Sequence, residues 1–199
     1  MTILAGIPVA TTSDIIDIQN EPEPEPDAES EPEPTLETEP LAPPEPTSEI
    51  QSVPAYKPLT VVANLAIPAY NTGFKSFMDY RKITNTKSAQ WRLQQDAVTD
   101  EYGFRRYAGY YMIALGSFYT HDEVGLKFRI TLESGTVFEA ITGDIKDDKD
   151  TDSTNRHKDG NIVEFIVDRN LIPAYCDLTG DMSHINNFSG KIVSIELLE

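Results

Sequence analysis

The most constraining feature of the sequence is an acidic, proline-rich run, EPEPEPDAESEPEPTLETEP, which begins at Glu21. Residues 1–56 hold 13 of the 33 acidic residues and 11 of the 14 prolines, and they contain no lysine or arginine. Such a segment cannot bury enough apolar surface to offset its ordering entropy, so we expect a disordered, polyproline-biased spacer. The sequence therefore predicts one folded domain, residues 57–199, behind a disordered tail, residues 1–56.

Charge and cysteine content exclude several classes of function. The chain carries a net charge of −17, and an acidic chain repels phosphate backbones, so we expect no nucleic-acid partner. Cys176 is the single cysteine, which rules out an intrachain disulfide and a four-cysteine zinc site. No apolar run reaches the about 18 residues that a membrane-spanning helix needs, so we expect no membrane span.

Short apolar runs separated by turn residues predict a β-rich domain. Near-helical spacing of apolar residues predicts one short helix in residues 73–83, and residues 59–67 could be a strand or a lead-in segment. Two hairpins are expected, each joining consecutive strands. We expect strands at residues 91–96, 104–119, 126–132, 137–141, 161–168 and 190–197. This pattern favours an all-β or β-rich α+β fold, a small six-stranded β-barrel with one short helix.

The most polar stretch of the domain, residues 143–160, holds six aspartates in 18 residues between two predicted strands. One interpretation is a solvated loop, in which these side chains form turns and surface ion pairs. A second interpretation is a metal-binding loop, and a third is a site for acid catalysis. The sequence alone leaves the three alternatives open.

The metal alternative rests on the spacing of four aspartates. Asp148, Asp150 and Asp152 lie at i, i+2 and i+4, and Asp159 occupies the twelfth position, a spacing of oxygen ligands that suits Ca²⁺. Ser153 stands where the sharp turn of such a loop needs glycine, and no helices flank the loop. We therefore assign no metal and no cofactor to the chain.

The acid-catalysis alternative rests on Asp144 and Glu164. Asp144 follows the apolar strand 137–141, so its carboxyl can lie partly desolvated at the rim of a barrel, with Asp152 or Glu164 near enough to repel its ionised form. Glu164 alternates with Ile162 and Ile166, which places a carboxylate among apolar neighbours. No nucleophile elbow, phosphate-binding loop or dinucleotide-binding glycine pattern offers a competing chemistry.

Three strings of the domain carry a family resemblance: YYMIALGSFY, GLKFRITLESGTVFEAITGD and NIVEFIVD. Together they resemble the double-psi β-barrel domain of the three-aspartate and lipoprotein A-like proteins of bacterial cell-wall metabolism. By that match Ala114 and Gly125 fill small-residue positions, Asp144 fills the first acidic position, and Glu164 stands where the family carries Asp. The Asp-Thr-Gly of the family is Asp144-Ile145-Lys146 in this chain. The domain is also similar to uncharacterised proteins of Gram-positive bacteria and their phages.

The resemblance implies a peptidoglycan-directed domain whose partner is the bacterial cell-wall glycan. As an enzyme it would be a lytic transglycosylase, in which Asp144 protonates the glycosidic oxygen. Glu164 or Asp152 would raise the pKa of Asp144, and Asn155 or Tyr119 would orient the sugar. Such a protein would be extracellular, associated with the cell wall, or part of a phage virion.

A non-catalytic alternative follows from the same resemblance, because this chain lacks the Asp-Thr-Gly string. The domain would then be a wall-binding module or a structural component of a phage virion, and it would dock through exposed aromatic side chains. Phe118, Tyr119 and Tyr175 are the candidates for that surface.

Overall fold

A computed structural model describes residues 59–199, and the predicted tail, residues 1–56, lies outside the described residues. The described part of the chain contains nine strands and three short α-helices. The strands are β1 (Val61–Asn64), β2 (Ser76–Asp79), β3 (Val98–Thr99), β4 (Arg105–Tyr107), β5 (Tyr110–Gly116), β6 (Lys127–Leu132), β7 (Val137–Lys146), β8 (Glu164–Val167) and β9 (Ile192–Leu198). The helices are α1 (Ala89–Gln95), α2 (Ser117–Thr120) and α3 (Ala174–Thr179), with 3-10 turns η1 (Tyr80–Lys82), η2 (Asp148–Asp150) and η3 (Met182–His184).

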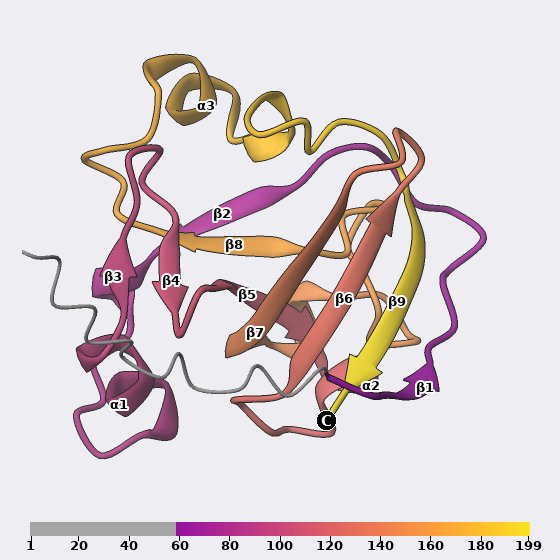
Figure 1. The fold of residues 1–199 in the computed structure, drawn as a ribbon, viewed down its shortest axis with the longest axis horizontal. Helices are drawn as coiled ribbons and strands as arrows, with labels where there is room; N and C mark the ends of the chain where they lie inside the picture. Colours follow the sequence, from indigo (N-terminus) through magenta and orange to yellow (C-terminus); the bar gives the residue numbers. More distant parts are fainter. Residues whose placement is uncertain (1–58) are drawn as a thin grey trace, which may run out of the picture. The chain divides into compact units, whose positions relative to one another are not determined.

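The strands form one mixed sheet with the order β1-β9-β6-β7-β5-β4-β3 (Figure 1). β4 and β8 both pair antiparallel with β5, β4 at its first residues and β8 further along the strand. β2 pairs parallel with β8. β5 and β7 are also parallel. β6, which lies between them in the sequence, pairs antiparallel with β7. The β-rich fold class is therefore confirmed. The expected six strands of a closed barrel differ from the structure, which has nine strands in an open sheet.

Two of the predicted elements are wrong. The helix expected in residues 73–83 is β2 followed by η1, because Ser76–Asp79 pair with Glu164–Val167 and the Asp79 carboxylate caps the following turn. The strand expected at residues 91–96 is α1, which begins where the Ser88 hydroxyl accepts a hydrogen bond from the Trp91 amide. In both segments the run of apolar residues is so short that its spacing fits either a helix or a strand.

The strand expected at residues 104–119 is instead two antiparallel strands, β4 and β5, and its last residues belong to α2. The strands expected at residues 126–132, 137–141, 161–168 and 190–197 agree with the structure in position. The hairpin around Glu133-Ser134-Gly135 joins β6 to β7, as the turn residues predict. β7 is longer than expected and continues through Lys146, so Asp144 lies within the strand rather than after it. This extension matters for the site, because a strand holds its side chains in fixed alternation.

The core centres on a cluster of aromatic rings from distant parts of the chain. Phe165 of β8 lies 4.8 Å from Phe104, 5.1 Å from Phe188 and 5.9 Å from Phe138, measured between ring centroids. Tyr111 of β5 joins the cluster, with its ring centroid 6.0 Å from that of Phe165. The cluster holds β8 against β5 and β7, and so supports the strands that carry the candidate acids.

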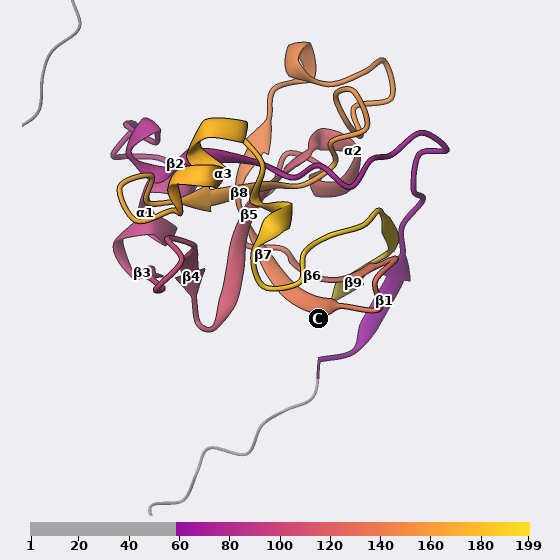
Figure 2. The same cartoon turned by 90° about the horizontal axis from the view of Figure 1, so that it is seen from above.

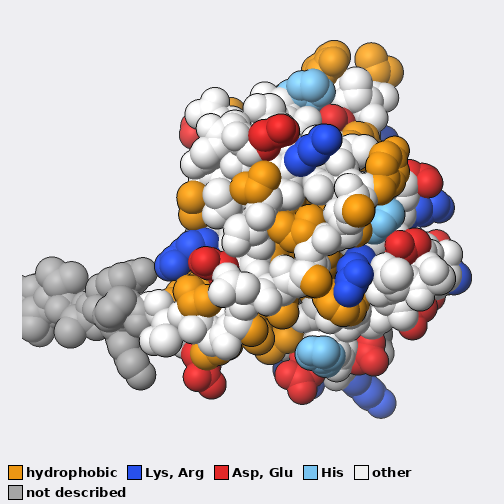
Figure 3. All heavy atoms as spheres, turned by 90° about the vertical axis from the view of Figure 1, so that its right-hand side faces the viewer, with side chains coloured by type: hydrophobic (Ala, Val, Ile, Leu, Met, Phe, Trp, Pro, Cys, Tyr) orange, Lys and Arg blue, Asp and Glu red, His pale blue; other side chains and the backbone are white. Residues whose placement is uncertain are grey.

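The remaining elements lie at the two ends of the sheet. Figure 2 shows α1, α3 and the β3–β4 hairpin on the side of β2 and β8, with β1 and β9 at the opposite side. The face shown in Figure 3 carries hydrophobic side chains in its middle, with acidic and basic side chains interspersed around them. That face presents no continuous patch of a single charge.

Lys75, just before β2, is a cation buried within the fold. Its side chain is 1% exposed, and its ammonium donates hydrogen bonds to the carbonyl oxygens of Gly73 and Gly190, each at 2.9 Å. Burial lowers the pKa of Lys75 from the ordinary 10.5 to about 8, against the opposing charge of Asp181. The folded chain therefore releases this proton at a lower pH than the unfolded chain does.

This difference predicts that stability rises with pH between about 8 and 10.5, because only the unfolded chain keeps the proton there. One proton of difference corresponds to about 1.4 kcal/mol in the free energy of unfolding per pH unit. Urea unfolding across this range should give a slope smaller by about that amount in Lys75→Met. Lys87→Met, at an exposed position, should keep the wild-type slope, and equal slopes in all three proteins would contradict the prediction.

Candidate functional site

The candidate acids lie in one row across neighbouring strands. In the β5–β7 pair Ala114 is opposite Asp144, and in the β5–β8 pair Ala114 is opposite Glu164. Glu164 is in turn opposite Ser76 of β2. Residues that lie opposite one another in a sheet present their side chains to the same face. The small side chain of Ala114 therefore stands between two carboxyl groups, and Asp144 and Glu164 share one face.

A β-bulge places Asp144 in this row. The register passes from Ile113 opposite Thr142 to Ala114 opposite Asp144, which leaves Gly143 without a partner on β5. A Cβ atom at Gly143 would lie 2.7 Å from the end of the Met112 side chain and 2.8 Å from that of Ile166, so a larger residue there would displace these side chains. Bulges of this kind redirect a side chain locally, and here the bulge aligns the Asp144 carboxyl with Ala114.

The row opens into a cavity of about 480 Å³. Its lining combines four acidic residues with three lysines and several small or polar side chains from β2, η1, β5, β7, β8 and the segment between β7 and β8. The lining residues are Ser76, Met78, Lys82, Ala114, Asp144, Ile145, Lys146, Asp147, Asp150, Lys158, Asn161 and Glu164. This is the size of a small-molecule binding site, and both acids of the row line it.

Burial governs the protonation of Asp144. It raises the pKa of the Asp144 carboxyl above its ordinary range, and two hydrogen bonds, from the Ile145 amide and the Gln90 side chain, act in the opposite direction. The Ile145 amide donates to the Asp144 carboxylate at 2.9 Å. The sequence suggested that a neighbouring carboxylate raises the pKa of Asp144. In the structure the largest cause of the rise is desolvation.

Glu164 has a different environment, although burial raises its pKa as well. The charge of Asp144 adds to that rise, whereas Lys146, Lys82 and a hydrogen bond with Ser76 favour the ionised form. Asp144 thus raises the pKa of Glu164, the reverse of the expected direction. Two lysines therefore favour ionised Glu164, and the interactions that favour ionised Asp144 are hydrogen bonds alone.

Lys146 is the residue that sequence reasoning missed. It is 8% exposed, its ammonium donates to the Asn161 carbonyl oxygen at 3.0 Å, and burial lowers its pKa to about 8 against the charge of Glu164. Alternation along a strand that continued past Ile141 would have placed Lys146 on the same face as Asp144. Lys82 and Gln90, from η1 and α1, carried no signal that a local pattern could reveal.

The structure does not bring Asp152 to this cavity. Its carboxylate accepts hydrogen bonds from the Thr154 amide and hydroxyl and lies 3.2 Å from His157 Nε2. These contacts hold the pKa of Asp152 below its ordinary range, with the Thr154 hydroxyl as the largest cause. Asp152 therefore organises the loop after β7 and keeps its charge.

Asn155 also lies outside the cavity lining. Its backbone adopts a left-handed conformation, and its carbonyl oxygen accepts a hydrogen bond from the Phe118 amide at 3.3 Å. A Cβ atom at Gly116 would lie 2.0 Å from that same oxygen. The absent side chain at Gly116 thus lets the Asp-rich loop rest on the end of β5.

We expect Gly116→Ala to lower the free energy of unfolding by about 2–3 kcal/mol, because backbone atoms of the loop must move to admit the methyl group. Urea unfolding monitored by circular dichroism measures the change. Gly73→Ala is the matched control, since its Cβ atom would make ordinary contacts starting at 3.4 Å. A loss no larger in Gly116→Ala than in this control would contradict the contact between loop and strand.

Tyr119 is a core residue rather than part of the cavity. It is 1% exposed, its hydroxyl donates to the Ala66 carbonyl oxygen at 3.1 Å, and burial raises its pKa to about 12. Of the five candidate site residues, the structure therefore brings Asp144 and Glu164 together and leaves Asp152, Asn155 and Tyr119 elsewhere.

The aspartates of the loop after β7 do not converge. Asp147 pairs with Lys149 at 2.7 Å, and Asp148 accepts a hydrogen bond from the Ser117 hydroxyl at 2.6 Å. Within residues 59–199 no group of three or more His, Cys, Asp or Glu side chains is arranged to hold a metal ion. The aspartates of this loop, whose spacing in the sequence suits Ca²⁺, thus take part in separate turns and ion pairs.

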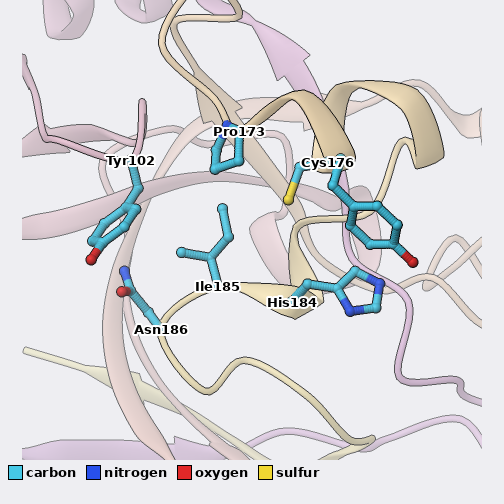
Figure 4. A pocket seen from close by; sticks show the side chains of 7 residues that line it. Tyr102, Pro173, Cys176, His184, Ile185 and Asn186 are labelled. Atoms are coloured by element: carbon cyan, nitrogen blue, oxygen red, sulfur yellow. The ribbon is translucent and has the colours of Figure 1, made fainter.

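A second hollow, of about 390 Å³, lies beside α3 and η3. Figure 4 shows Tyr102 on one side of it and Cys176 and His184 on the other, with Pro173 and Ile185 between them. Tyr175, which also lines it, is 57% exposed, and its ring centroid lies 4.9 Å from that of His184. Of the three aromatic residues expected to dock to a partner, Tyr175 is the one that is well exposed.

Comparison of the chain with protein-family models, curated proteins and solved structures finds no match. Among the described helices, none has the length and apolar character required to cross a membrane.

Proposed function

We propose that this domain is a peptidoglycan-directed lytic transglycosylase with Asp144 as its general acid. One observation carries the proposal: Asp144 and Glu164 flank Ala114 in register and line one cavity in which burial raises the pKa of both. A carboxyl group that stays protonated near neutral pH can donate a proton to a leaving oxygen. The resemblance of the strands around these residues to double-psi barrels of cell-wall metabolism supports the choice of substrate.

The unequal surroundings of the two carboxyl groups assign their roles. Lys146 and Lys82 favour ionised Glu164, whereas the interactions that favour ionised Asp144 are hydrogen bonds, so we assign the proton to Asp144. Two carboxyl groups whose environments differ commonly divide the work into acid and electrostatic stabiliser. Ionised Glu164 would stabilise the positive charge that develops at the anomeric carbon as the bond breaks.

The proposed reaction balances without water. Asp144 gives its proton to the glycosidic oxygen, and the bond between that oxygen and the anomeric carbon breaks. The 6-hydroxyl of the same sugar then attacks the anomeric carbon, and its proton passes to the Asp144 carboxylate. The acid is restored, and the sugar ends in a 1,6-anhydro ring.

The test is to incubate wild-type protein with purified cell walls and to identify the soluble fragments by mass spectrometry. We expect fragments that end in a 1,6-anhydro sugar and are lighter by one water than the products of hydrolysis. Release of hydrolysed ends alone would change the reaction class to hydrolysis. Release of no fragments would refute the catalytic function.

The hollow beside α3 favours a second candidate, a wall-binding module. Exposed Tyr175 and Tyr102, at 57% and 39% exposure, offer ring faces of the kind that bind partners. Under this alternative wall sedimentation retains the protein, Asp144→Asn leaves that retention unchanged, and no fragments are released. Absence of sedimentation with walls would favour a virion component instead.

A further inference from the structure

We propose that a hollow between η1 and α1 is a sugar-binding subsite for the same glycan, with Trp91 as the surface on which a sugar ring stacks. The inference rests on the proposed function, because it assigns the substrate chain a path away from Asp144. The residues that line this subsite take no part in the proposed reaction.

Shared lining residues link three hollows along this path. Beyond the cavity that contains Glu164 lies a smaller hollow of about 260 Å³, and Lys82 and Asp144 line both. That hollow shares Ile83 and Thr84 with a third one, of about 370 Å³, which contains Trp91. The three hollows therefore follow residues 82–84, and the candidate acid lies where the first two meet.

The third hollow has aromatic walls. Tyr80 and Trp91 line it, together with the buried side chain of Ile83. The Arg105 guanidinium lies 4.4 Å from the centroid of the Tyr80 ring, and its Nε donates to the Gln94 side-chain oxygen at 3.0 Å. These contacts fix the Tyr80 wall before any ligand arrives, which limits the entropy that binding costs.

Polar groups border these apolar walls. Thr84 and Gln95 are exposed at the hollow, and the Gln95 side-chain amide donates to the Trp91 carbonyl oxygen at 3.3 Å. A pyranose ring presents C–H bonds on its faces and hydroxyl groups at its edge. An aromatic wall with a hydroxyl and an amide beside it complements both parts of such a ring.

The occupant follows from the lining residues that link this hollow, through the smaller one, to the cavity at Asp144. A polymer whose scissile bond lies at Asp144 extends in both directions from it, and one direction leads along residues 82–84 to Trp91. We therefore assign the hollow to a sugar unit of the glycan rather than to a separate ligand.

Trp91 is the single tryptophan of the chain, so its fluorescence reports on this hollow alone. The experiment titrates a β-1,4-linked N-acetylglucosamine tetramer into Asp144→Asn protein, which prevents turnover. We expect a change in Trp91 emission, protection from acrylamide quenching, and a Kd that matches calorimetry. Heat of binding without any change in Trp91 emission would overturn the subsite, and so would the absence of binding by both methods.

A variant tests the energetic contribution of the ring. Trp91→Ala in the Asp144→Asn background should raise the calorimetric Kd about tenfold, as the loss of a stacking contact predicts. Tyr70→Ala, an exposed aromatic outside the three hollows, should leave the Kd unchanged. An unchanged Kd in a folded Trp91→Ala protein would overturn the subsite, and the fluorescence titration tests the inference without altering Trp91.

The inference and the proposed function fail in different ways. If wild-type protein releases no fragments from walls yet the tetramer alters Trp91 emission, the catalytic function is refuted and the subsite stands as a binding site. If fragments are released but the tetramer leaves Trp91 unaffected, the catalytic function stands and the subsite is refuted.

Discussion

Asp144→Asn is expected to lower the rate of fragment release from purified walls by about a hundredfold or more, the contribution typical of a positioned general acid. Asparagine keeps the shape of the side chain and can still accept the hydrogen bond from the Ile145 amide, but it has no proton to give at the leaving oxygen. Fragment release quantified against time at fixed pH measures the loss.

The control for this variant is Asp122→Asn. Asp122 is exposed and has a left-handed backbone conformation that asparagine adopts readily, so the substitution removes one charge without disturbing the fold. It should release fragments at the wild-type rate. Equal rates in the wild-type and Asp144→Asn proteins would exclude Asp144 as the acid, provided that both melt at similar temperatures.

Phe165→Ala is expected to lower the free energy of unfolding by about 3–5 kcal/mol, the range for removing a buried phenylalanine ring. Phe165 is 0% exposed and stacks against Phe188, with ring planes 25° apart. Truncation removes the ring that joins Phe104, Phe138 and Phe188, and it leaves a void beside β5. Urea unfolding followed by circular dichroism measures the loss.

Phe74→Ala is the matched control for the core, because Phe74 is 37% exposed and belongs to no such cluster of rings. We expect it to cost less than about 1 kcal/mol. Comparable losses in the two variants would show that the aromatic cluster is not the centre of stability.

Local patterns in the sequence predicted the elements that depend on neighbouring residues. Alternation on both sides of Glu133-Ser134-Gly135 predicted the β6–β7 hairpin, because its turn and both strands lie within one short stretch. The same reasoning failed for Ser76–Asp79, whose strand exists through pairing with Glu164–Val167, more than 80 residues away. It also failed at α1, where a short apolar run fits either type of element.

For the site, residue chemistry in the sequence singled out Asp144 and Glu164. A carboxylate at the end of an apolar strand or among apolar neighbours is costly to bury, which indicates a paired or functional group. The partners of these acids came from the fold alone. A bulge at Gly143 and the pairing of β5 with both β7 and β8 bring the two carboxyl groups to either side of Ala114. Lys146 reaches the same cavity because β7 extends further than its apolar residues indicate.

The sequence by itself determined the β-rich class, the hairpin turns and the two acids, since each of these follows from the chemistry of residues close together in the chain. The tertiary structure alone decided that those acids face one cavity, that burial raises the pKa of Asp144, and that Asp152, Asn155 and Tyr119 have other roles. The physical reason is that desolvation and strand register are set by contacts between distant segments, and neither is encoded in the residues adjacent to a side chain.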